Sequence, residues 1–371
     1  PIVGSTLVSI ESDGRVVIDG SVVRKIKVRL GIPSLAKYAM VTNAVVYYGS
    51  GDEVFGPIHS NIGVGFLSGA PQPIAHNIVT SAAATVNGRF GVYTTVPAAD
   101  PNPPAAVPNR PTVFVSGRQF PVPAVDFTSI TGDLATIKAN AIASGFYRAA
   151  SGGVGYKLVL KVNDTFDLYK VNSLLPIPGG CSNSQGQAGW GTWSVGTIAG
   201  ATTLLGNYPS TANGLVFLED HVWVEGQING ARLTIAAGVF PVNPATYKNI
   251  IVNNNLSYTN FDGTDALGLI AQGNFLIGMA SADNLVVDGA IIAQNGQTIR
   301  YYYNGCGAWN FRTSLTTYGM FASNGQGFFY YGTSGYQSQP ASYDANFLYG
   351  PPPSFPLTGN QYQIISWQEL Y

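Results

Sequence analysis

Along this chain, hydrophobic positions recur with a period of two over short stretches, which is typical of β-strands and not of helices. The clearest alternation ends at Leu30 and places Val22, Arg24, Ile26 and Val28 on one face of a strand, with mainly basic residues on the other. Gly, Asn, Asp and Pro interrupt the apolar stretches every few residues. Most of the chain is therefore expected to form short strands of about four to eight residues.

One segment departs from this pattern and predicts a helix. Ile130, Leu134, Ile137 and Ile142 follow approximately helical spacing. Ser129, or the threonine before it, is a suitable residue to cap the helix start, and Gly145 is suited to its end. A single helix is therefore expected within an otherwise strand-rich chain.

A loosely repeated unit lies between about residues 214 and 335. It consists of a short apolar strand, a small and a polar residue, an Asn or Gly corner, and a second short strand. Ile270, Ile292 and Phe321 occupy similar places in successive units and are 22 and 29 residues apart. Such a repeat favours a β-solenoid, in which stacked coils bury a continuous apolar column. A β-sandwich is the alternative, although its hairpins are usually spaced about 8–12 residues apart.

These patterns predict a mainly β, solenoid-like fold with one inserted region. Residues 1–94 are expected to form N-terminal strands and the first coils, and residues 95–213 an inserted α+β region with a Pro-rich loop. Residues 214–371 are expected to supply the remaining coils and a C-terminal cap. Three consecutive prolines at 351–353 precede the last apolar strand, and proline removes a backbone donor that further strand pairing would need.

Composition narrows the possible functions. Charged residues make up 10% of the chain and the net charge is −1, which excludes a nucleic-acid binder that works through bulk positive charge. No apolar run of 18 or more residues suggests a membrane span. The chain starts at Pro1 and not at an initiator methionine, so we expect upstream residues, and the lack of a targeting segment does not indicate location.

Four segments resemble bacterial pilus-assembly surface proteins of the large type IV pilin-like or PilX-like kind. They are residues 48–61, 126–134, 267–273 and 343–353. The resemblance implies a non-enzymatic structural or adhesive component of an extracellular, pilus-associated cell-surface assembly, with pilin-like subunits as partners. Proteins of this kind carry an apolar N-terminal helix that is missing here, so membrane contact is expected only through such a helix upstream. No catalytic residues come with the resemblance.

Two alternatives belong to other classes: a polysaccharide-active enzyme and a glycan-binding module on a β-helix. Glycoside hydrolysis needs two carboxyl groups that face each other. The sequence contains 19 acidic residues, and their spacing does not require any two of them to meet. The aromatic runs Tyr301–Tyr303 and Phe328–Tyr331 can stack on sugar rings or pack against another subunit. A surface glycan is therefore a candidate partner.

The histidines offer two further hypotheses. His59 lies beside Ser60, but adjacent residues of a strand point to opposite faces, which argues against a catalytic Ser–His pair. His221 can share a strand face with Glu219 and Glu225, which would suit a metal ion. The simpler interpretation of the second group is a polar outer face of a coil.

Two candidate sites involve Asp and Cys residues. Asp262 and Asp265 lie in an oxygen-rich turn that is a candidate calcium site, although the turn departs from the EF-hand pattern and both residues are also good turn formers. The sequence therefore predicts either no cofactor or calcium. Cys181 and Cys306 can form a disulfide in an extracellular setting, or remain free thiols.

The last hypothesis concerns assembly. The open ends of a solenoid present unpaired backbone groups, which other chains can extend by strand addition. Because the prolines are expected to close the C-terminal end, we predict self-association or docking into a filament through Val22, Arg24, Ile26 and Val28. The alternative is that this basic strand is simply a solvated edge.

Overall fold

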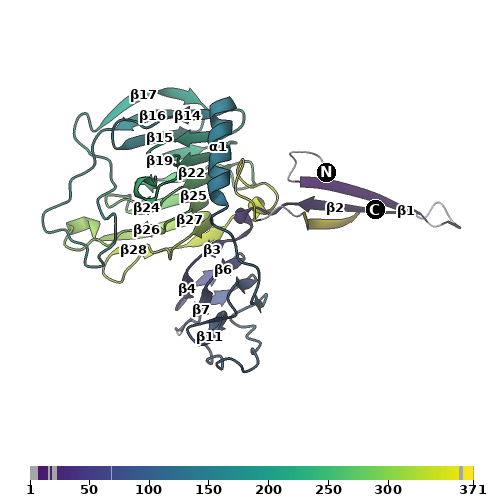
Figure 1. The fold of residues 1–371 in the computed structure, drawn as a ribbon. Helices are drawn as coiled ribbons and strands as arrows, with labels where there is room; N and C mark the ends of the chain where they lie inside the picture. Colours follow the sequence, from purple (N-terminus) through teal and green to yellow (C-terminus); the bar gives the residue numbers. More distant parts are fainter. Residues whose placement is uncertain (1–6, 16, 19–22, 68, 359–361, 371) are drawn as a thin grey trace.

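The computed structural model describes residues 7–15, 17–18, 23–67, 69–358 and 362–370. Within them it contains thirty strands, one α-helix and four short 3-10 helices, so the mainly β prediction is confirmed. None of the helices in these ranges is long and apolar enough to cross a membrane. Figure 1 shows three parts: a main block of strands, a smaller block below it, and an arm that projects from their junction.

A ladder of ten parallel strands connects the two blocks. Its order is β14 (Phe146–Arg148), β18 (Leu215–Leu218), β20 (Arg232–Ala237), β23 (Ala266–Ala271), β25 (Asn284–Ala293), β27 (Phe311–Ser323), β3 (Met40–Thr42), β6 (Ile58–Ser60), β9 (Val79–Ser81) and β13 (Arg118–Gln119). The main block extends from β14 to β27, and the N-terminal block starts at β3. The strands of the N-terminal block thus stack beneath β27, which lies near the end of the sequence.

The remaining strands of the main block form parallel ladders beside the first. They are β15 (Gly155–Lys161), β19 (His221–Ile228), β21 (Ile250–Val252), β22 (Leu256–Tyr258), β24 (Phe275–Ile277), β26 (Thr298–Arg300), β28 (Gly335–Ser338) and β29 (Ala341–Tyr343). Two antiparallel strands, β16 (Thr165–Val171) and β17 (Thr202–Pro209), extend the sheet beyond β15.

The N-terminal block repeats the same arrangement with shorter strands. A second parallel ladder joins β4 (Val45–Tyr48), β7 (Gly63–Phe66) and β12 (Val92–Thr94), and a third joins β5 (Glu53–Val54) and β8 (Ile74–Ala75). A small hairpin is formed by β10 (Thr85–Val86) and β11 (Arg89–Phe90).

The main core lies between the ladders, and a second core lies outside the ten-strand ladder. In β23, Leu267 and Leu269 face the inner core, while Ala266 and Ile270 face the outer one. All six residues of β23 are buried, which explains why the central strands are continuous apolar runs and do not alternate with polar residues.

The helix α1 (Ile130–Ser144) covers part of this outer face (Figure 1). Ile130, Leu134 and Ile137 are buried as the spacing predicted, and Gly145 follows the helix end. Ile142 is 57% exposed, so its place on the buried face was wrong; Ala141 is buried instead. Ser129, one of the two predicted caps, does occupy the N-cap position, but its side chain makes no capping hydrogen bond. The Oδ1 of Asp126 accepts hydrogen bonds from the backbone N–H groups of the two residues before α1, at 2.8 and 3.3 Å.

The predicted alignment of successive units is correct for the first pair of strands and is shifted by one residue for the second. Ile270 pairs directly with Ile292, as the spacing suggested, but Phe321 pairs with Ile291. A shift of one residue moves a side chain to the opposite face of a strand. Ile270 and Ile292 therefore belong to the outer core, whereas Phe321 packs against the inner one.

Two expectations about the chain's organisation need revision. Strands β14 and β15 fall inside the predicted insertion 95–213, yet they pair in parallel with β18 and β19 and continue the main block. The expected C-terminal cap is also different. Only residues before the last strand cover the outer face, where Phe355 is buried, whereas β30 (Gln363–Leu370) leaves the body and pairs with β2 (Val23–Gly31).

Candidate functional site

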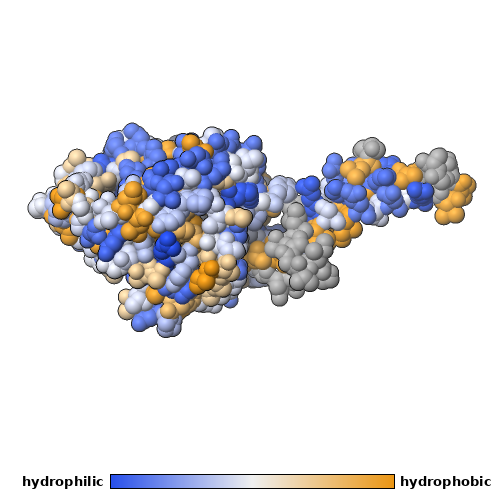
Figure 2. Space-filling model, turned by 90° about the horizontal axis from the view of Figure 1, so that it is seen from above, coloured by the Kyte–Doolittle hydropathy of each residue, from blue (hydrophilic) through white to orange (hydrophobic). Residues whose placement is uncertain are grey.

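The arm is a three-stranded antiparallel sheet in the order β1 (Leu7–Arg15), β2, β30. Figure 2 shows it standing clear of the body, with hydrophobic and hydrophilic residues alternating along it. Opposite residues in this register share a face of the sheet. One face carries the rows Val8–Leu30–Ile364, Ile10–Val28–Trp367 and Ser12–Ile26–Glu369.

The two faces of the arm differ in chemistry. Ile10, Ile364 and Trp367 on the apolar face are 47%, 69% and 59% exposed. On the other face, the Lys27 ammonium lies 2.7 Å from the Glu11 carboxylate, and Lys25 and Asp13 form a second, longer ion pair. These ion pairs lie within one chain, whereas the apolar face has no cover among the described residues.

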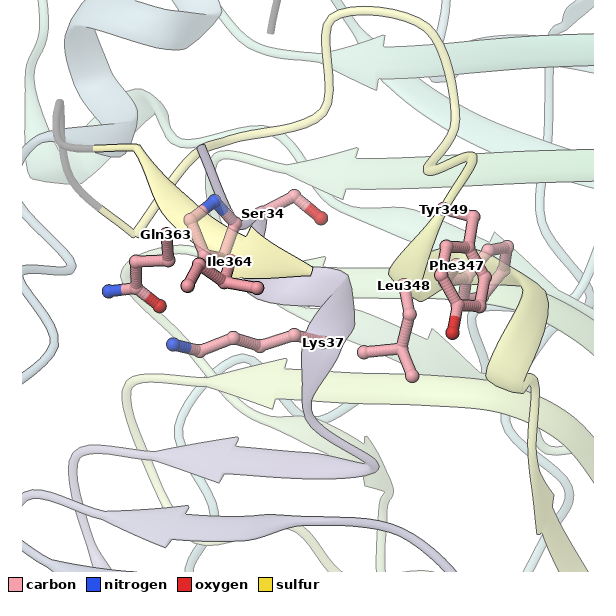
Figure 3. Close-up of a pocket in the computed structure, with 8 residues that line it drawn as sticks. Ser34, Lys37, Phe347, Leu348, Tyr349, Gln363 and Ile364 are labelled. Atoms are coloured by element: carbon pink, nitrogen blue, oxygen red, sulfur yellow. The ribbon is translucent and has the colours of Figure 1, made fainter. Parts of the chain in front are cut away.

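Hydrogen bonds fix the base of the arm to the body. The backbone N–H of Leu35 donates to the carbonyl of Pro356 at 2.8 Å, and Thr358 donates to the carbonyl of Pro33 through its N–H and its hydroxyl. A cavity of about 190 Å³ lies beside this attachment and is lined by residues that include Lys37, Tyr349 and Ile364 (Figure 3). Burial lowers the pKa of the Lys37 ammonium.

The predicted assembly residues lie on this arm, but not at its edge. Val22 is outside the described residues, and Arg24, Ile26 and Val28 lie on β2, which is paired on both sides. Arg24 forms an ion pair with Glu369. The strands with an unpaired outer edge are β1 and β30. Sequence reasoning missed β30, because nothing local indicates that the last strand pairs with one more than 330 residues earlier.

A cleft of about 730 Å³ opens between the two blocks, and we call it the aromatic cleft. Its walls come from β3, β4 and β5 of the N-terminal block and from β26, β27 and the segments after them in the main block. The aromatic lining residues are Tyr47, Tyr48, Phe55, Phe321, Phe328, Phe329 and Tyr330. The polar lining residues are Thr42, Asp52, Glu53, Thr298, Thr317, Ser323, Gln326, Gln339 and Ser342.

Four of these rings remain accessible. Tyr47, Phe55, Phe328 and Tyr330 are 42%, 54%, 36% and 41% exposed. The ring of Phe55 stacks on the imidazole of His76, with ring centres 4.2 Å apart, and this contact fixes the orientation of the Phe55 ring. Exposed aromatic residues gathered in one concavity are typical of binding sites and not of ordinary protein surface.

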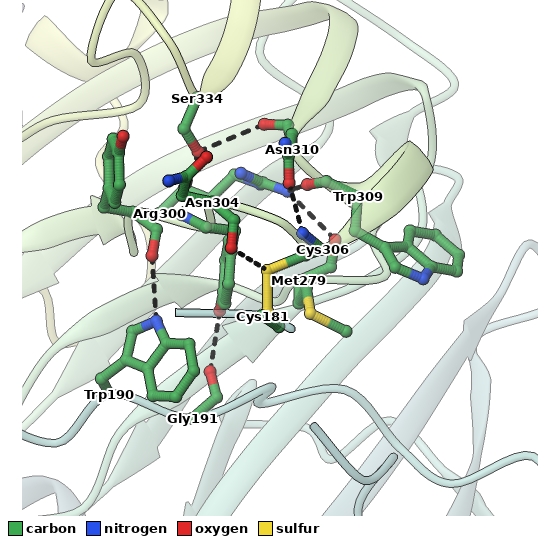
Figure 4. The surroundings of a disulfide bond; sticks show 12 residues. Cys181, Trp190, Gly191, Met279, Arg300, Asn304, Cys306, Trp309, Asn310 and Ser334 are labelled. Atoms are coloured by element: carbon green, nitrogen blue, oxygen red, sulfur yellow. Dashed lines mark hydrogen bonds between the residues drawn. A yellow bond between two sulfur atoms is a disulfide. The ribbon is translucent and has the colours of Figure 1, made fainter. Parts of the chain in front are cut away.

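The two aromatic runs predicted from the sequence have different environments. Phe328 and Tyr330 line the aromatic cleft, whereas all three residues of the run Tyr301–Tyr303 are buried. The loop around Cys181 covers this second run: the indole N–H of Trp190 donates to the carbonyl of Tyr302 at 2.9 Å (Figure 4). Stacking of sugars on Tyr301–Tyr303 is therefore excluded in this fold.

A disulfide holds that loop in place. Cys181 is bonded to Cys306 across 125 residues of sequence (Figure 4). The backbone N–H of Cys306 also donates to Oδ1 of Asn310 at 2.8 Å. The bond therefore attaches the loop to the segment between β26 and β27.

His59 and His221 are hydrogen-bonded within the fold. His59 is 1% exposed, and its ring nitrogens lie 2.9 Å from the hydroxyl of Thr80 and 3.0 Å from Oδ1 of Asn61. Ser60 instead donates to the carbonyl of Ala44. Burial lowers the pKa of His221 to about 4, and its Nδ1 accepts a hydrogen bond from the backbone N–H of Asn249.

The acidic groups considered as metal ligands are also separated. Glu219 forms an ion pair with Lys138, and Glu225 forms one with Lys157 at 2.7 Å. In the part of the chain that the structure describes, no three His, Cys, Asp or Glu side chains converge as a metal site. The hypothesis of a site at His221 is therefore wrong.

The candidate calcium residues serve as hydrogen-bond acceptors. Asp265 is 1% exposed and accepts from the backbone N–H groups of Ala231, Thr259 and Asn260 at 2.7–3.1 Å. Asp262 accepts from the backbone N–H and the hydroxyl of Thr264. The turn is thus held together by its own donors, and calcium binding there stays a prediction.

Among the solved structures that are similar to this chain over most of its length is the competence-associated pilin ComZ from Thermus thermophilus. The two share 12% identity with a TM-score of 0.36, over 98% of this chain and 81% of that one. No family model matches the chain, and no curated protein does. A likeness this distant transfers no function, so the case for function depends on the arm and the aromatic cleft.

Proposed function

We propose that this chain is a non-enzymatic structural or adhesive component of an extracellular, pilus-type cell-surface assembly, whose copies join through the arm. The observation that carries the proposal is the arm's apolar face, which stands away from the body with Ile10, Ile364 and Trp367 exposed. A second copy of the arm would cover this face without the burial of any unpaired charge.

The edges of the arm favour pairing in addition to face-to-face packing. The outer edges of β1 and β30 present backbone donors and acceptors to which another strand can add. The hydrogen-bonded base keeps the sheet in a set direction, which reduces the ordering cost when two copies meet. Arg24, Ile26 and Val28 contribute by holding β1 and β30 together, and not as the edge itself.

A finer description of the fold is part of the proposal. We take the parallel ladders to be a β-solenoid whose coils run from β14 to β27 and continue through β3 to β13. The support is the shared parallel direction of all ten ladder strands, together with the core enclosed between neighbouring ladders. A stack of this kind suits a rigid spacer in a surface assembly.

The bond between Cys181 and Cys306 favours an extracellular location, because disulfides persist mainly in oxidising compartments. The surroundings of the histidines favour a role without catalysis. His59 is buried and His221 half-buried, and ring nitrogens of both are hydrogen-bonded within the fold, which argues against either as a general base on an outside substrate.

Light scattering of the full chain tests the arm as the assembly surface. We expect the particle mass to rise with concentration, and Trp367→Lys to shift it back toward a single chain, because a charge on the apolar face would be buried on association. Ile142→Lys is the matched control: Ile142 lies on α1, far from the arm in sequence, and is 57% exposed against 59% for Trp367.

Two results would contradict the proposal. One is a single-chain mass for the unaltered protein at the highest concentration that stays soluble. The other is an equal loss of association in both variants, which would indicate a general solubility effect and not a surface on the arm. Circular dichroism of each variant establishes that it is folded.

A further inference from the structure

We infer that the aromatic cleft binds a neutral oligosaccharide. This inference deepens the adhesive role proposed above and rests on it, because it names the ligand class and the place where the ligand would be held. The cleft volume of about 730 Å³ falls within the range of about 300–1,000 Å³ that is usual for small-molecule sites.

The arrangement of rings suits sugars. Pyranose rings have C–H groups on their faces, which pack on aromatic faces, and hydroxyl groups around their rims. Tyr47 and Phe55 come from one wall, and Phe328 and Tyr330 from the other, so a chain of sugars would meet a ring on either side. Phe55 is positioned by its stack on His76 before any ligand arrives.

The polar groups of the cleft match the rims of such sugars. Gln326 and Gln339 supply amides, and the exposed Ser342 supplies a hydroxyl, which can both donate and accept hydrogen bonds as sugar hydroxyls do. A purely apolar occupant, such as a lipid chain, would cover the Gln326 amide and the Ser342 hydroxyl without giving them hydrogen-bond partners.

The charge of the cleft decides against an anionic ligand. Its described lining includes no Lys, Arg or His, and it contains two carboxylates. Asp52 already accepts a hydrogen bond from the backbone N–H of Gly49 at 2.6 Å, and Glu53 lies 3.0 Å from Nε2 of His76. These two carboxylates would repel a uronate, sulfated or sialylated glycan, whereas they would not repel a neutral glycan.

The ligand would also connect the two blocks. Beside the cleft they are joined by the short pairing of β27 with β3, which involves three residue pairs from Phe321–Met40 to Ser323–Thr42. An oligosaccharide that touches Tyr47 and Tyr330 would add contacts across this junction. Binding should therefore raise the thermal midpoint of the full chain and slow amide exchange in β3.

Isothermal titration calorimetry with the full chain tests the inference. The neutral probes are the hexasaccharides of cellulose, starch, mannan, xylan and chitin. Oligogalacturonate is the anionic probe and deacetylated chitohexaose the cationic one. We expect saturable binding of at least one neutral probe at about 1 mM or below, and a loss of about fivefold or more in affinity in Phe55→Ala and in Tyr330→Ala. Phe261→Ala should bind normally, because Phe261 lies outside the cleft lining and is 55% exposed, against 54% for Phe55.

Repeating the titration with Trp367→Lys separates the two proposals. If this variant binds a neutral probe but does not associate, the cleft inference is supported and binding does not depend on assembly. If the unaltered chain associates but binds no neutral probe, the cleft inference alone is overturned. The inference is also overturned if only the anionic or only the cationic probe binds. Equal weakening by Phe55→Ala, Tyr330→Ala and Phe261→Ala would overturn it too, because the bound site would then lie elsewhere.

Discussion

Replacing Asp288 by asparagine should stabilise this protein at neutral pH but hardly at pH 4. Asp288 is 2% exposed, on β25. Burial, and to a lesser extent the nearby carboxylate of Asp344, raise the pKa of its carboxyl group to about 6, although the hydrogen bond from the backbone N–H of Tyr258, 2.9 Å from Oδ2, acts in the opposite direction. The folded protein therefore holds the proton more tightly than the unfolded chain does.

The direction and the size of this change in stability follow from proton linkage. Below pH 3.8 the carboxyl is protonated in both states and carries no penalty; above about 6 it is ionised in both, and the folded state bears the full cost. The pKa difference of about 2.2 corresponds to about 3 kcal/mol. At pH 7 the penalty is about 3 kcal/mol, and at pH 4 it is less than about 1 kcal/mol. Asparagine removes the charge and keeps an oxygen that can accept the Tyr258 bond.

Urea denaturation at pH 4 and at pH 7 measures this difference. We expect Asp288→Asn to raise the free energy of unfolding by up to about 3 kcal/mol at pH 7 and far less at pH 4. Asp283→Asn is the control of opposite sign, because a hydrogen bond from Thr313 lowers the pKa of the exposed Asp283 carboxyl, so its ionised form favours folding at neutral pH. An equal gain at both pH values, or a loss at pH 7, would refute the reasoning.

Four further predictions follow from single features of the fold. Cys181→Ser should lower the free energy of unfolding by as much as about 5 kcal/mol, because the bond to Cys306 closes a separation of 125 residues; urea denaturation with and without reductant measures it, and no effect of reductant would contradict it. Gly319→Ala should cost more than about 3 kcal/mol, since Gly319 has a φ of +142° and its added Cβ would collide with the carbonyl oxygen of Gly289; an unchanged melting temperature would disprove this. Leu269→Ala should cost about 2–5 kcal/mol by opening a cavity in the inner core, checked by the same denaturation assay. Incubation with neutral polysaccharides should release no reducing ends, and a turnover abolished by one Asp or Glu replacement would establish the enzymatic alternative.

The sequence by itself determined the features that depend on neighbours in the chain. Strand-rich character, the helix from Ile130 and the burial of Leu134 and Ile137 follow from spacing and from Gly and Pro punctuation. The repeated strand unit was visible as far as the pairing of Ile270 with Ile292. These features need only local backbone preference and an apolar period, and both are written in consecutive residues.

Tertiary structure alone decided which distant segments meet. The pairing of β30 with β2, and of β27 with β3, joins strands that are hundreds of residues apart, and no local pattern specifies such partners. Register belongs to the same class: the shift that places Phe321 opposite Ile291 depends on how the intervening loop packs and not on spacing. The aromatic cleft exists only because the β27–β3 pairing brings Tyr47 beside Tyr330, since closing so long a loop is rewarded by contacts made at its two ends.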